Sequence, residues 1–342
     1  MSLTTELKAR VLELGFHCVG VTSPEPFEEA ELQIARWLSE GHQGDMAWLT
    51  AARARLATRP EDLLPGARSL IVVGVAYRTQ DPAAGDGGRI ARYAWGTDYH
   101  VAMKARLRLV AGWLSERAGR PVASRVFVDD GPLVERDAAV RAGLGFRGKN
   151  TNLLTPIGSY VFLGALLTDV ALAFDQPVAR DCGSCRLCID ACPTNALDEA
   201  YHLAAERCIA YLTIEHRGPI PTDLRPSLGE WVFGCDVCQE VCPWNRKAPP
   251  TREPALRVRA DLEALDLLAT LRLSEEGFRE RFRGTALMRT RRRGLVRNAA
   301  LVLGNRADPA SLPALRQVLG DTDPVIRDAA QWAIQRIAEV NL

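Results

Sequence analysis

Hydrophobic residues change their spacing along the chain, and these changes divide it into three stretches. In the first stretch, continuous apolar runs predict buried strands at 69–77, 125–130 and 159–170, and HCVGV predicts a shorter one. Helical spacing predicts helices at 4–14, 26–40, 46–55, 101–118 and 133–142. Strands that alternate with helices are typical of layered α/β domains, so we expect residues 1–175 to form one.

The other two stretches are a loop-rich region at 176–250 and a helical region at 251–342. In DTDPVIRDAAQWAIQRI, Asp323 is expected to cap a helix that carries Pro324 in its first turn. Together with RNAALVLGN and ASLPALRQVLG, this segment resembles stacked helix pairs of the HEAT type. Only about two such units fit, so we expect the helical domain to pack against its neighbour for stability.

The loop-rich region opens with four cysteines within eleven residues: Cys182, Cys185, Cys188 and Cys192. Disulfides need an oxidising compartment, but the N-terminal residues include Glu6, Lys8 and Arg10 where an export signal would be apolar. The uncharged, largely apolar stretch 153–168 contains Pro156 and Gly158 and is too short to span a membrane. We therefore expect a cytoplasmic protein without membrane segments, whose reduced thiols bind a metal.

The cysteine spacing C-x2-C-x2-C-x3-C-P is that of bacterial ferredoxins, which favours iron–sulfur clusters and leaves zinc as the alternative. In such a run the fourth cysteine binds a second cluster, so a second run is needed. GCDVCQEVCPWN supplies it but has Val232 where its first cysteine would stand, which leaves Cys208 as the substitute. The predicted ligand sets are Cys182, Cys185, Cys188 and Cys242 for one cluster and Cys192, Cys208, Cys235 and Cys238 for the other. Cys18, the remaining cysteine, is expected to be a buried core thiol.

The composition is that of an ordinary globular protein, with 342 residues, 47% hydrophobic and 25% charged. A formal net charge of +1 excludes a uniformly basic nucleic-acid binder. A local basic face is present, however, because residues 281–306 contain eight arginines and no acidic residue. A solvated helix surface would explain some arginines, but this many without a carboxylate favour a phosphate or nucleic-acid partner.

Iron–sulfur clusters carry electrons but do not determine a substrate, so we expect the catalytic residues to lie in the first domain. No G-x-G-x-x-G follows the first strand of this domain, which argues against a nicotinamide site. The segment AGLGFRGKN lacks the spacing of a phosphate loop. Its glycines, at 143, 145 and 148, are instead expected to let the backbone approach a large flat ligand closely. Asp129 and Asp130 end a predicted strand, where either could be a proton donor or both could cap the next helix. Tyr99 and His100 are further polar groups, expected to be structural by default.

Several motifs together resemble one known family. They are RYAWGTDYH, VDDGPLVERDAAVRAGLGFRGKN, DCGSCRLCIDACPT, RCIAYLTIEHRG, GCDVCQEVCPWN and FRGTALMRTRRRGLVRNAALVLGN. In this order, over nearly the whole chain, they resemble the epoxyqueuosine reductases, cobalamin-dependent enzymes that complete queuosine on tRNA. That family usually has Ser or Thr after its key aspartate, where this chain has Asp130; alignment on Pro132 then selects Asp129 as the match.

The resemblance implies three domains: an α/β catalytic domain that binds base-off cobalamin (1–175), a ferredoxin-like module with two [4Fe–4S] clusters (176–250), and a tRNA-contacting, HEAT-like helical domain (251–342). It implies reduction of epoxyqueuosine to queuosine in the tRNA anticodon, with electrons passing from the clusters to cobalamin and Asp129 as proton donor. Further expected cobalamin contacts are Lys149, Asn150, Ser159, Ala210 and Asp236, and expected RNA contacts are Arg291, Arg292, Arg293 and Arg297. A low-potential electron donor is an expected partner, and the chain is expected to be a monomer.

Two other functions are weighed against this one. A cobalamin-dependent reductive dehalogenase would share the cofactors, but such enzymes usually carry an export signal and would have no use for the arginine-rich stretch. An electron-transfer subunit of the ferredoxin type would need no large cofactor pocket, so cobalamin binding would separate it from the enzyme.

Overall fold

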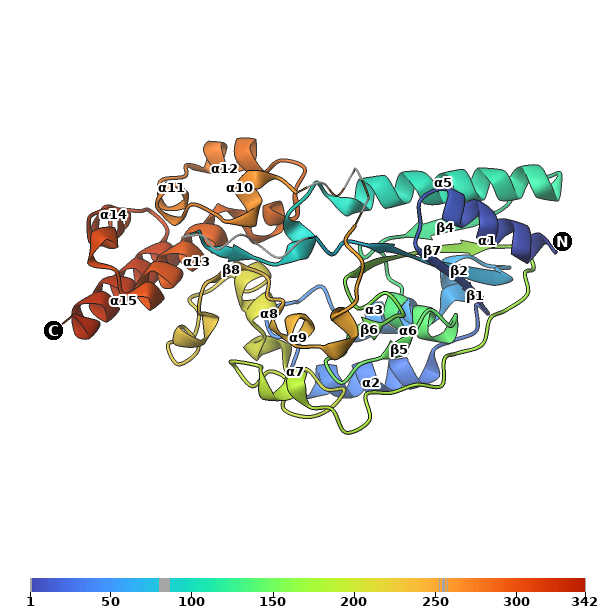
Figure 1. Ribbon diagram of the computed structural model, residues 1–342, viewed down its shortest axis with the longest axis horizontal. Helices are drawn as coiled ribbons and strands as arrows, with labels where there is room; N and C mark the ends of the chain where they lie inside the picture. The colour runs from blue at the N-terminus through green and yellow to red at the C-terminus, as the bar shows by residue number, and fades with distance from the viewer. Residues whose placement is uncertain (1, 80–86, 252, 254–255, 257, 342) are drawn as a thin grey trace.

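The computed structural model describes residues 2–79, 87–251, 253, 256 and 258–341. The N-terminal sheet and its helices lie at one end of an elongated molecule, and the C-terminal helices lie at the other (Figure 1). The cysteine-containing loops occupy the middle and pack against both ends (Figure 1). Among the described residues, no helix is long and apolar enough to cross a membrane.

The first domain is built on a sheet with the strand order β1-β2-β7-β4. Its strands are β1 (Cys18–Thr22), β2 (Ser69–Ala76), β7 (Val161–Thr168) and β4 (Ser124–Phe127). All three neighbouring pairs are antiparallel, and β2 and β7 pair over eight residues each. The expected mixture of helices and strands is confirmed, but an antiparallel sheet has no common carboxyl edge. Ligand placement therefore cannot be inferred from the rule for parallel sheets.

Helices cover both faces of this sheet, as the alternation of side chains along β2 requires. Ile71, Val73 and Val75 face α1 (Leu3–Glu13) and α5 (Tyr99–Ala118). The intervening residues, Leu70 and Val72, face the core on the side of α2 (Glu28–Ser39), α4 (Pro60–Leu63) and α6 (Glu135–Arg141). A further helix, α3 (Ala51–Ala57), packs beside α2. The strand β2 is thus buried on both sides, which explains its continuous apolar sequence.

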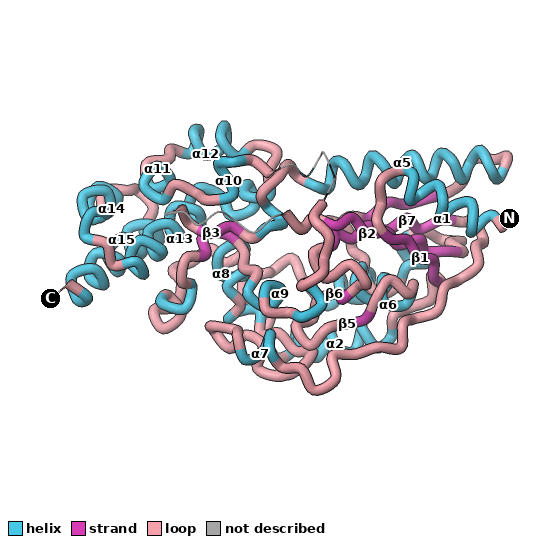
Figure 2. The backbone as a smooth tube through the Cα atoms, viewed as in Figure 1, coloured by secondary structure: helices cyan, strands magenta, loops and turns pink. Residues whose placement is uncertain are grey.

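The cysteine module has little regular structure (Figure 2). It contains α7 (Leu187–Asp190), α8 (Ile209–Ile214), β8 (Trp231–Phe233) and α9 (Val237–Glu240), with short 3-10 turns between them. The strand β8 pairs in parallel with β3 (Arg89–Ile90), and a small hairpin of β5 (Phe146–Arg147) and β6 (Leu153–Leu154) lies alongside. Helices of four residues have little stability of their own, so other interactions must order this module.

The C-terminal region is helical, as expected. It comprises α10 (Ala260–Glu263), α11 (Leu267–Leu271), α12 (Glu275–Phe282), α13 (Arg291–Arg306), α14 (Leu312–Val318) and α15 (Pro324–Val340). Residues 294–304 of α13 are all buried, and α15 packs along it. The predicted cap at Asp323 is confirmed, because its carboxylate accepts a hydrogen bond from the Val325 N–H at 3.0 Å. One hydrophobic core joins α13 to α8 and β8, so the helical region does pack against the cysteine module.

Candidate active site and cysteine module

The eight clustered cysteines gather in two groups of four. Cys188 lies within electrostatic range of Cys182, Cys185 and Cys242. In the second group, Cys235 lies within range of Cys192 and Cys208, and Cys238 lies within range of Cys235 and Cys208 and also of Cys188 in the first group. These proximities agree with the two ligand sets predicted from spacing, including the exchange of Cys192 and Cys242 between the runs, and the assignment of each ligand stays a prediction. All eight are free thiols.

The cysteine thiols lie in partly or fully buried positions, where ionisation to a thiolate costs free energy unless a cation is bound. Burial, followed by the neighbouring thiols, raises the pKa of Cys188 and of Cys238. A metal centre offsets that cost, because metal ligation deprotonates cysteine. Cys18 differs, since it lies in β1 outside both groups, and burial raises its pKa to about 12. It is the core thiol expected from the sequence.

Lys149 and Asn150 attach the first domain to both cysteine runs. The Lys149 N–H donates to Cys182 Sγ at 3.5 Å, and its Nζ donates to the carbonyl oxygens of Gly183 (2.6 Å) and Cys185 (3.0 Å). Asn150 Nδ2 donates to the Cys238 carbonyl oxygen at 3.3 Å. In this structure their polar groups hold the cysteine loops, and the contact with cobalamin expected of both residues stays a prediction.

Of the other residues expected to contact cobalamin, Ser159 and Asp236 make hydrogen bonds within the protein, and Ala210 lies on α8. Ser159 Oγ donates to Gln239 Oε1 at 2.8 Å, and the buried Asp236 accepts from the Arg92 N–H at 2.7 Å. Burial raises the pKa of Asp236 to about 6. Ala210 is half-buried on α8. These residues line the junction of sheet and module, and their contact with a cofactor stays a prediction.

The glycines of AGLGFRGKN serve the protein's own packing. A Cβ at Gly145 would lie 2.1 Å from the Leu154 carbonyl oxygen, and one at Gly143, where φ is +74°, would lie 2.5 Å from the Gln176 carbonyl oxygen. The close approach of backbone is therefore confirmed, but the partner is protein backbone and not the large flat ligand that the sequence suggested.

Asp129 adopts an unusual backbone conformation just after β4. Its φ is +57°, in the left-handed region. This conformation costs about 1–3 kcal/mol and persists only where other contacts of the residue stabilise it. Two contacts do so: its N–H donates to Glu135 Oε1 at 2.8 Å, and its Oδ2 accepts from the Tyr99 hydroxyl at 3.0 Å. The neighbouring Asp130 makes an ion pair with Lys104 instead. The two aspartates, both exposed, thus have different partners, and only Asp129 contacts the buried Tyr99.

The groups around Asp129 are tuned by burial and by its charge. Burial, and then the Asp129 carboxylate, raise the pKa of Glu135 to about 8 and raise the pKa of Tyr99. Tyr99 stacks on Phe162 with ring centroids 3.9 Å apart. His100 stacks on Tyr99 and pairs with Asp98 at 2.5 Å, so it has a structural role. Tyr99 therefore stays a hydrogen-bond donor to Asp129 at neutral pH.

The sheet places Asp129 and the cysteine module at one edge. Because β2 and β4 both run antiparallel to β7, their ends meet the beginning of β7. Asp129 follows β4 at this edge, and Ser159 precedes β7, with its N–H donating to Asn245 of the module at 2.7 Å. Thr79, just after β2, has a buried hydroxyl without a hydrogen-bond partner among the described residues. An acid, an unsatisfied hydroxyl and the thiol groups thus share one end of the domain.

Comparison with known proteins decides the family. A protein from Xanthomonas campestris pv. campestris named epoxyqueuosine reductase is 40% identical over 331 residues, which are 94% of this chain and 92% of that protein. A protein of the same name from Pseudomonas aeruginosa is 40% identical over 338 residues, which cover 96% of this chain and 92% of that protein. The chain belongs to the epoxyqueuosine reductase family.

Family models and solved structures agree with this. The model described as "Epoxyqueuosine reductase QueG, DUF1730" matches residues 58–130, and the "4Fe-4S double cluster binding domain" matches residues 181–245. An epoxyqueuosine reductase solved with an epoxyqueuosine-modified tRNA stem loop superposes with a TM-score of 0.90 at 32% identity, covering 98% of this chain and 90% of that one. The Streptococcus thermophilus epoxyqueuosine reductase gives a TM-score of 0.90 at 29% identity, covering 99% and 91%.

The arginines expected to contact RNA differ in their exposure. In this member of the family, Arg291 is exposed, whereas Arg292 pairs with Asp321 and the exposed Arg293 pairs with Asp323. Arg297 is only 1% exposed, and its guanidinium donates to the carbonyl oxygens of His216 (2.9 Å) and Gly218 (2.7 Å). Its expected RNA contact is therefore wrong, because its side chain faces the core and fixes the loop after α8.

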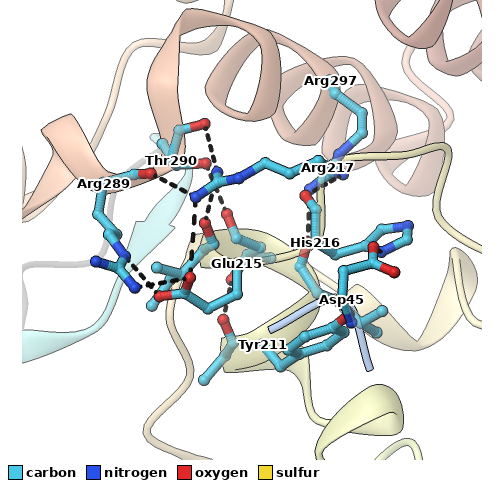
Figure 3. Close-up of polar contacts among 12 residues, drawn as sticks. Asp45, Tyr211, Glu215, His216, Arg217, Arg289, Thr290 and Arg297 are labelled. Carbon is cyan, nitrogen blue, oxygen red and sulfur yellow. Dashed lines mark hydrogen bonds and ion pairs between the residues drawn. The ribbon is translucent and has the colours of Figure 1, made fainter. Parts of the chain in front are cut away.

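Figure 3 shows how that loop joins three parts of the chain. Arg217 donates to the carbonyl oxygens of Thr290 (3.3 Å) and Arg289 (3.1 Å), at the start of α13. His216 Nδ1 pairs with Asp45 at 2.7 Å, and Tyr211 in α8 accepts from the Asp45 N–H at 2.6 Å (Figure 3). The segment after α2 is thereby held against the cysteine module and the helical region.

Three residues beside this network were missed by the sequence analysis. Arg289 forms a two-point ion pair with Glu215 (2.8 and 3.1 Å) and lies within electrostatic range of Asp129. Trp48 is 48% exposed, with the guanidinium groups of Arg53 and Arg289 at 5.2 and 6.0 Å from its ring centre. A tryptophan in the polar turn GDMAWLT, followed by AARAR, is the signal that could have indicated them.

Proposed function

We propose that this chain reduces epoxyqueuosine to queuosine in tRNA. The carrying observation is that Asp129, with its hydrogen-bond partners, and the cysteine module lie at the same end of one sheet. Membership of the epoxyqueuosine reductase family over more than nine-tenths of the chain supports the substrate. The related structure that contains an epoxyqueuosine-modified tRNA stem loop supports the same substrate class.

The residues present fit the cofactors that this reaction requires. Two groups of four thiols match two [4Fe–4S] clusters, as the matching double-cluster model describes. Two features at this end of the sheet suit cobalamin. One is the hydrogen-bonded pair of Asp129 and Tyr99, and the other is the buried Thr79 hydroxyl, which has no hydrogen-bond partner within the described residues. When bound, these groups supply low-potential electrons, delivered one at a time, for reduction of the substrate. An external low-potential donor must refill them.

The protein's own contribution is to supply and position a proton. Removal of the epoxide oxygen as water takes two electrons and two protons, so a positioned acid lowers the barrier. Asp129 is the acid, and its carboxyl is oriented by the Tyr99 hydroxyl at 3.0 Å. Glu135 holds the Asp129 backbone in its left-handed conformation, and its raised pKa, about 8, keeps a proton beside the site at neutral pH.

The tRNA would approach over the surface formed by Trp48, Arg53, Arg289, Arg291 and Arg293. Trp48 offers an exposed ring on which an unstacked base can lie, with arginines on it that can bind phosphates. Arg289 links this surface to Asp129, since each lies within electrostatic range of the other. This placement brings a base held on the surface toward the acid.

The function is tested by mass spectrometry of nucleosides from tRNA containing epoxyqueuosine, after incubation with cluster-loaded protein, cobalamin and a chemical reductant. We expect loss of the epoxynucleoside and a matching gain of queuosine, and no conversion when cobalamin is omitted. Intact epoxyqueuosine with loaded, reduced protein would overturn the proposal and return the chain to an electron-transfer role.

A further inference from the structure

A cluster of metal-binding side chains lies outside the site described above, where the segment after α2 meets the loop before Cys208. It consists of Glu40, His42 and His202, flanked by Asp198 and Glu206. One ligand atom from each of Glu40, His42 and His202 lies within 4.8 Å of the others. The two imidazole centroids are 4.8 Å apart and their planes are 75° apart, so the rings are in edge-to-face contact.

Each imidazole is oriented by a carboxylate on its Nδ1. His42 Nδ1 lies 3.0 Å from Glu206 Oε1, and His202 Nδ1 lies 2.7 Å from Asp198 Oδ1. A carboxylate that accepts the Nδ1–H fixes the tautomer in which Nε2 carries a free lone pair, the arrangement found around metal-binding histidines. His42 Nε2 lies 3.5 Å from a carboxylate oxygen of Glu40, and a cation between these two atoms would relieve the repulsion of their lone pairs.

We propose that Glu40, His42 and His202 bind a divalent transition-metal ion, with zinc as the best match. Two imidazoles and one carboxylate form a donor set that zinc prefers, with water as the fourth ligand. Ligand atoms around tetrahedral zinc lie about 3.4 Å apart, so the side chains must close by about 1 Å. Their side chains are 37%, 20% and 23% exposed, which leaves room for rotation and for entry of the ion.

The ion would connect two distant parts of the chain. His42 follows α2, whereas His202 lies just before the 3-10 turn (Ala205–Arg207) that leads directly into Cys208. The same two segments already touch, because Trp37 Nε1 in α2 donates to the Leu203 carbonyl oxygen at 2.7 Å. A metal at this point would fasten the segment that carries Cys208 to the first domain. The competing explanation is a set of ion pairs between protonated histidines and the surrounding carboxylates, which needs no metal.

The test is direct measurement of bound zinc in cluster-loaded, full-length protein, by equilibrium dialysis against zinc chloride with zinc and iron quantified together. We expect about one zinc per chain in addition to full iron, and loss of that zinc in His42→Ala and His202→Ala with iron unchanged. Asp198→Asn keeps all three ligands but removes the partner of His202 Nδ1, so it should weaken zinc affinity about 10- to 100-fold. That variant decides the matter if an alanine variant fails to fold.

His216→Ala is the matched control, because both ring nitrogens of His216 are already engaged, by Asp45 at 2.7 Å and by the Pro219 carbonyl oxygen at 2.9 Å. It should bind zinc as the unmodified protein does. Two results would overturn the proposal. One is a fully iron-loaded protein that binds no zinc, which leaves ion pairs as the explanation. The other is zinc binding that is unchanged by Asp198→Asn and both alanine variants, which places the zinc elsewhere, for example on cysteine.

Discussion

The sheet domain and the cysteine module are ordered by different forces. In the sheet domain, every residue of β2 is buried and helices cover both faces, so burial of apolar side chains specifies the fold. In the module, α7 and α9 have four residues each and begin two residues after a cysteine, and much of the chain is loop. Such a module depends on its metal centres for order, as small metal-binding domains do. In the proposed function the active site lies where the two meet, with the sheet positioning the acid and the module delivering electrons.

The largest effect is expected from removal of the acid that the sheet positions. Asp129→Asn keeps the hydrogen bonds that the backbone makes but cannot deliver a proton, so turnover should fall about 10²- to 10⁴-fold. Iron content and tRNA affinity should not change, because the residue is outside the module. Asp130→Asn is the matched control: its carboxylate pairs with Lys104, and its loss should cost little activity. An inactive Asp130→Asn beside an active Asp129→Asn would move the acid by one residue.

Damage to the sheet core should lower stability without touching the iron. Leu107 on α5 is fully buried between helix and sheet. Leu107→Ala should lower the free energy of unfolding by about 2–5 kcal/mol, because apolar burial is reduced and a cavity is left behind. Denaturant melts would measure this, with iron per chain unchanged. Loss of iron in this variant would show that the module takes its order from the sheet and not from its clusters.

How much of this could be read from the sequence depends on the range of the interactions. The strands at 69–77 and 159–170 and the cysteine sets followed from local spacing, and the structure brings the same residues together. The antiparallel order of the strands could not be read in this way, because the pairing of β2 with β7 joins residues 85 to 99 positions apart, such as Ser69 and Thr168 at 99. Local patterns carry no information on that choice.

The arginine-rich stretch shows the same limit for the site. Counting arginines gave Arg291 and Arg297 equal weight, but the helix α13 is enclosed by α8, β8 and α15 and turns Arg297 into the core. The role of Glu135 also escaped notice, since its partner is a backbone N–H that becomes available only in the left-handed conformation of Asp129. Charge is visible in a sequence, whereas exposure and backbone partners come from tertiary structure.

The surface at the junction predicts a smaller, salt-dependent effect on tRNA binding. Arg53→Glu combined with Arg291→Glu should weaken affinity and reduce the salt slope by about 0.9 for each phosphate that the protein no longer neutralises. Arg316→Glu, an equal charge change on an exposed residue of α14, is the control and should leave the slope unchanged. Binding measured across a salt series checks this. Equal effects of the double variant and the control would show that the surface contributes only through the overall charge of the protein and not through contacts with tRNA phosphates.

The smallest effect concerns pH and the Asp129 loop. Burial raises the pKa of Glu135 to about 8 from an ordinary 4.5, so the folded state holds a proton that the unfolded state releases. This contribution to stability is full below pH 4.5 and is lost as the pH rises to about 8, with no further change above. Because the Glu135 side chain is only half-buried, solvent screening limits this contribution to about 1 kcal/mol. Glu135→Gln should flatten that slope in unfolding measurements from pH 5 to 8, and an unchanged slope would contradict the assignment.

The central claim is that two exchanged sets of four cysteines each hold one cluster, so that the module is ordered by metal. Iron and sulfide per chain in anaerobically reconstituted Cys208→Ser test it most directly, with Cys18→Ser as the control outside both groups. We expect about four irons in Cys208→Ser, half of the roughly eight expected for two [4Fe–4S] clusters, and about eight in the control. Full iron in Cys208→Ser would contradict it.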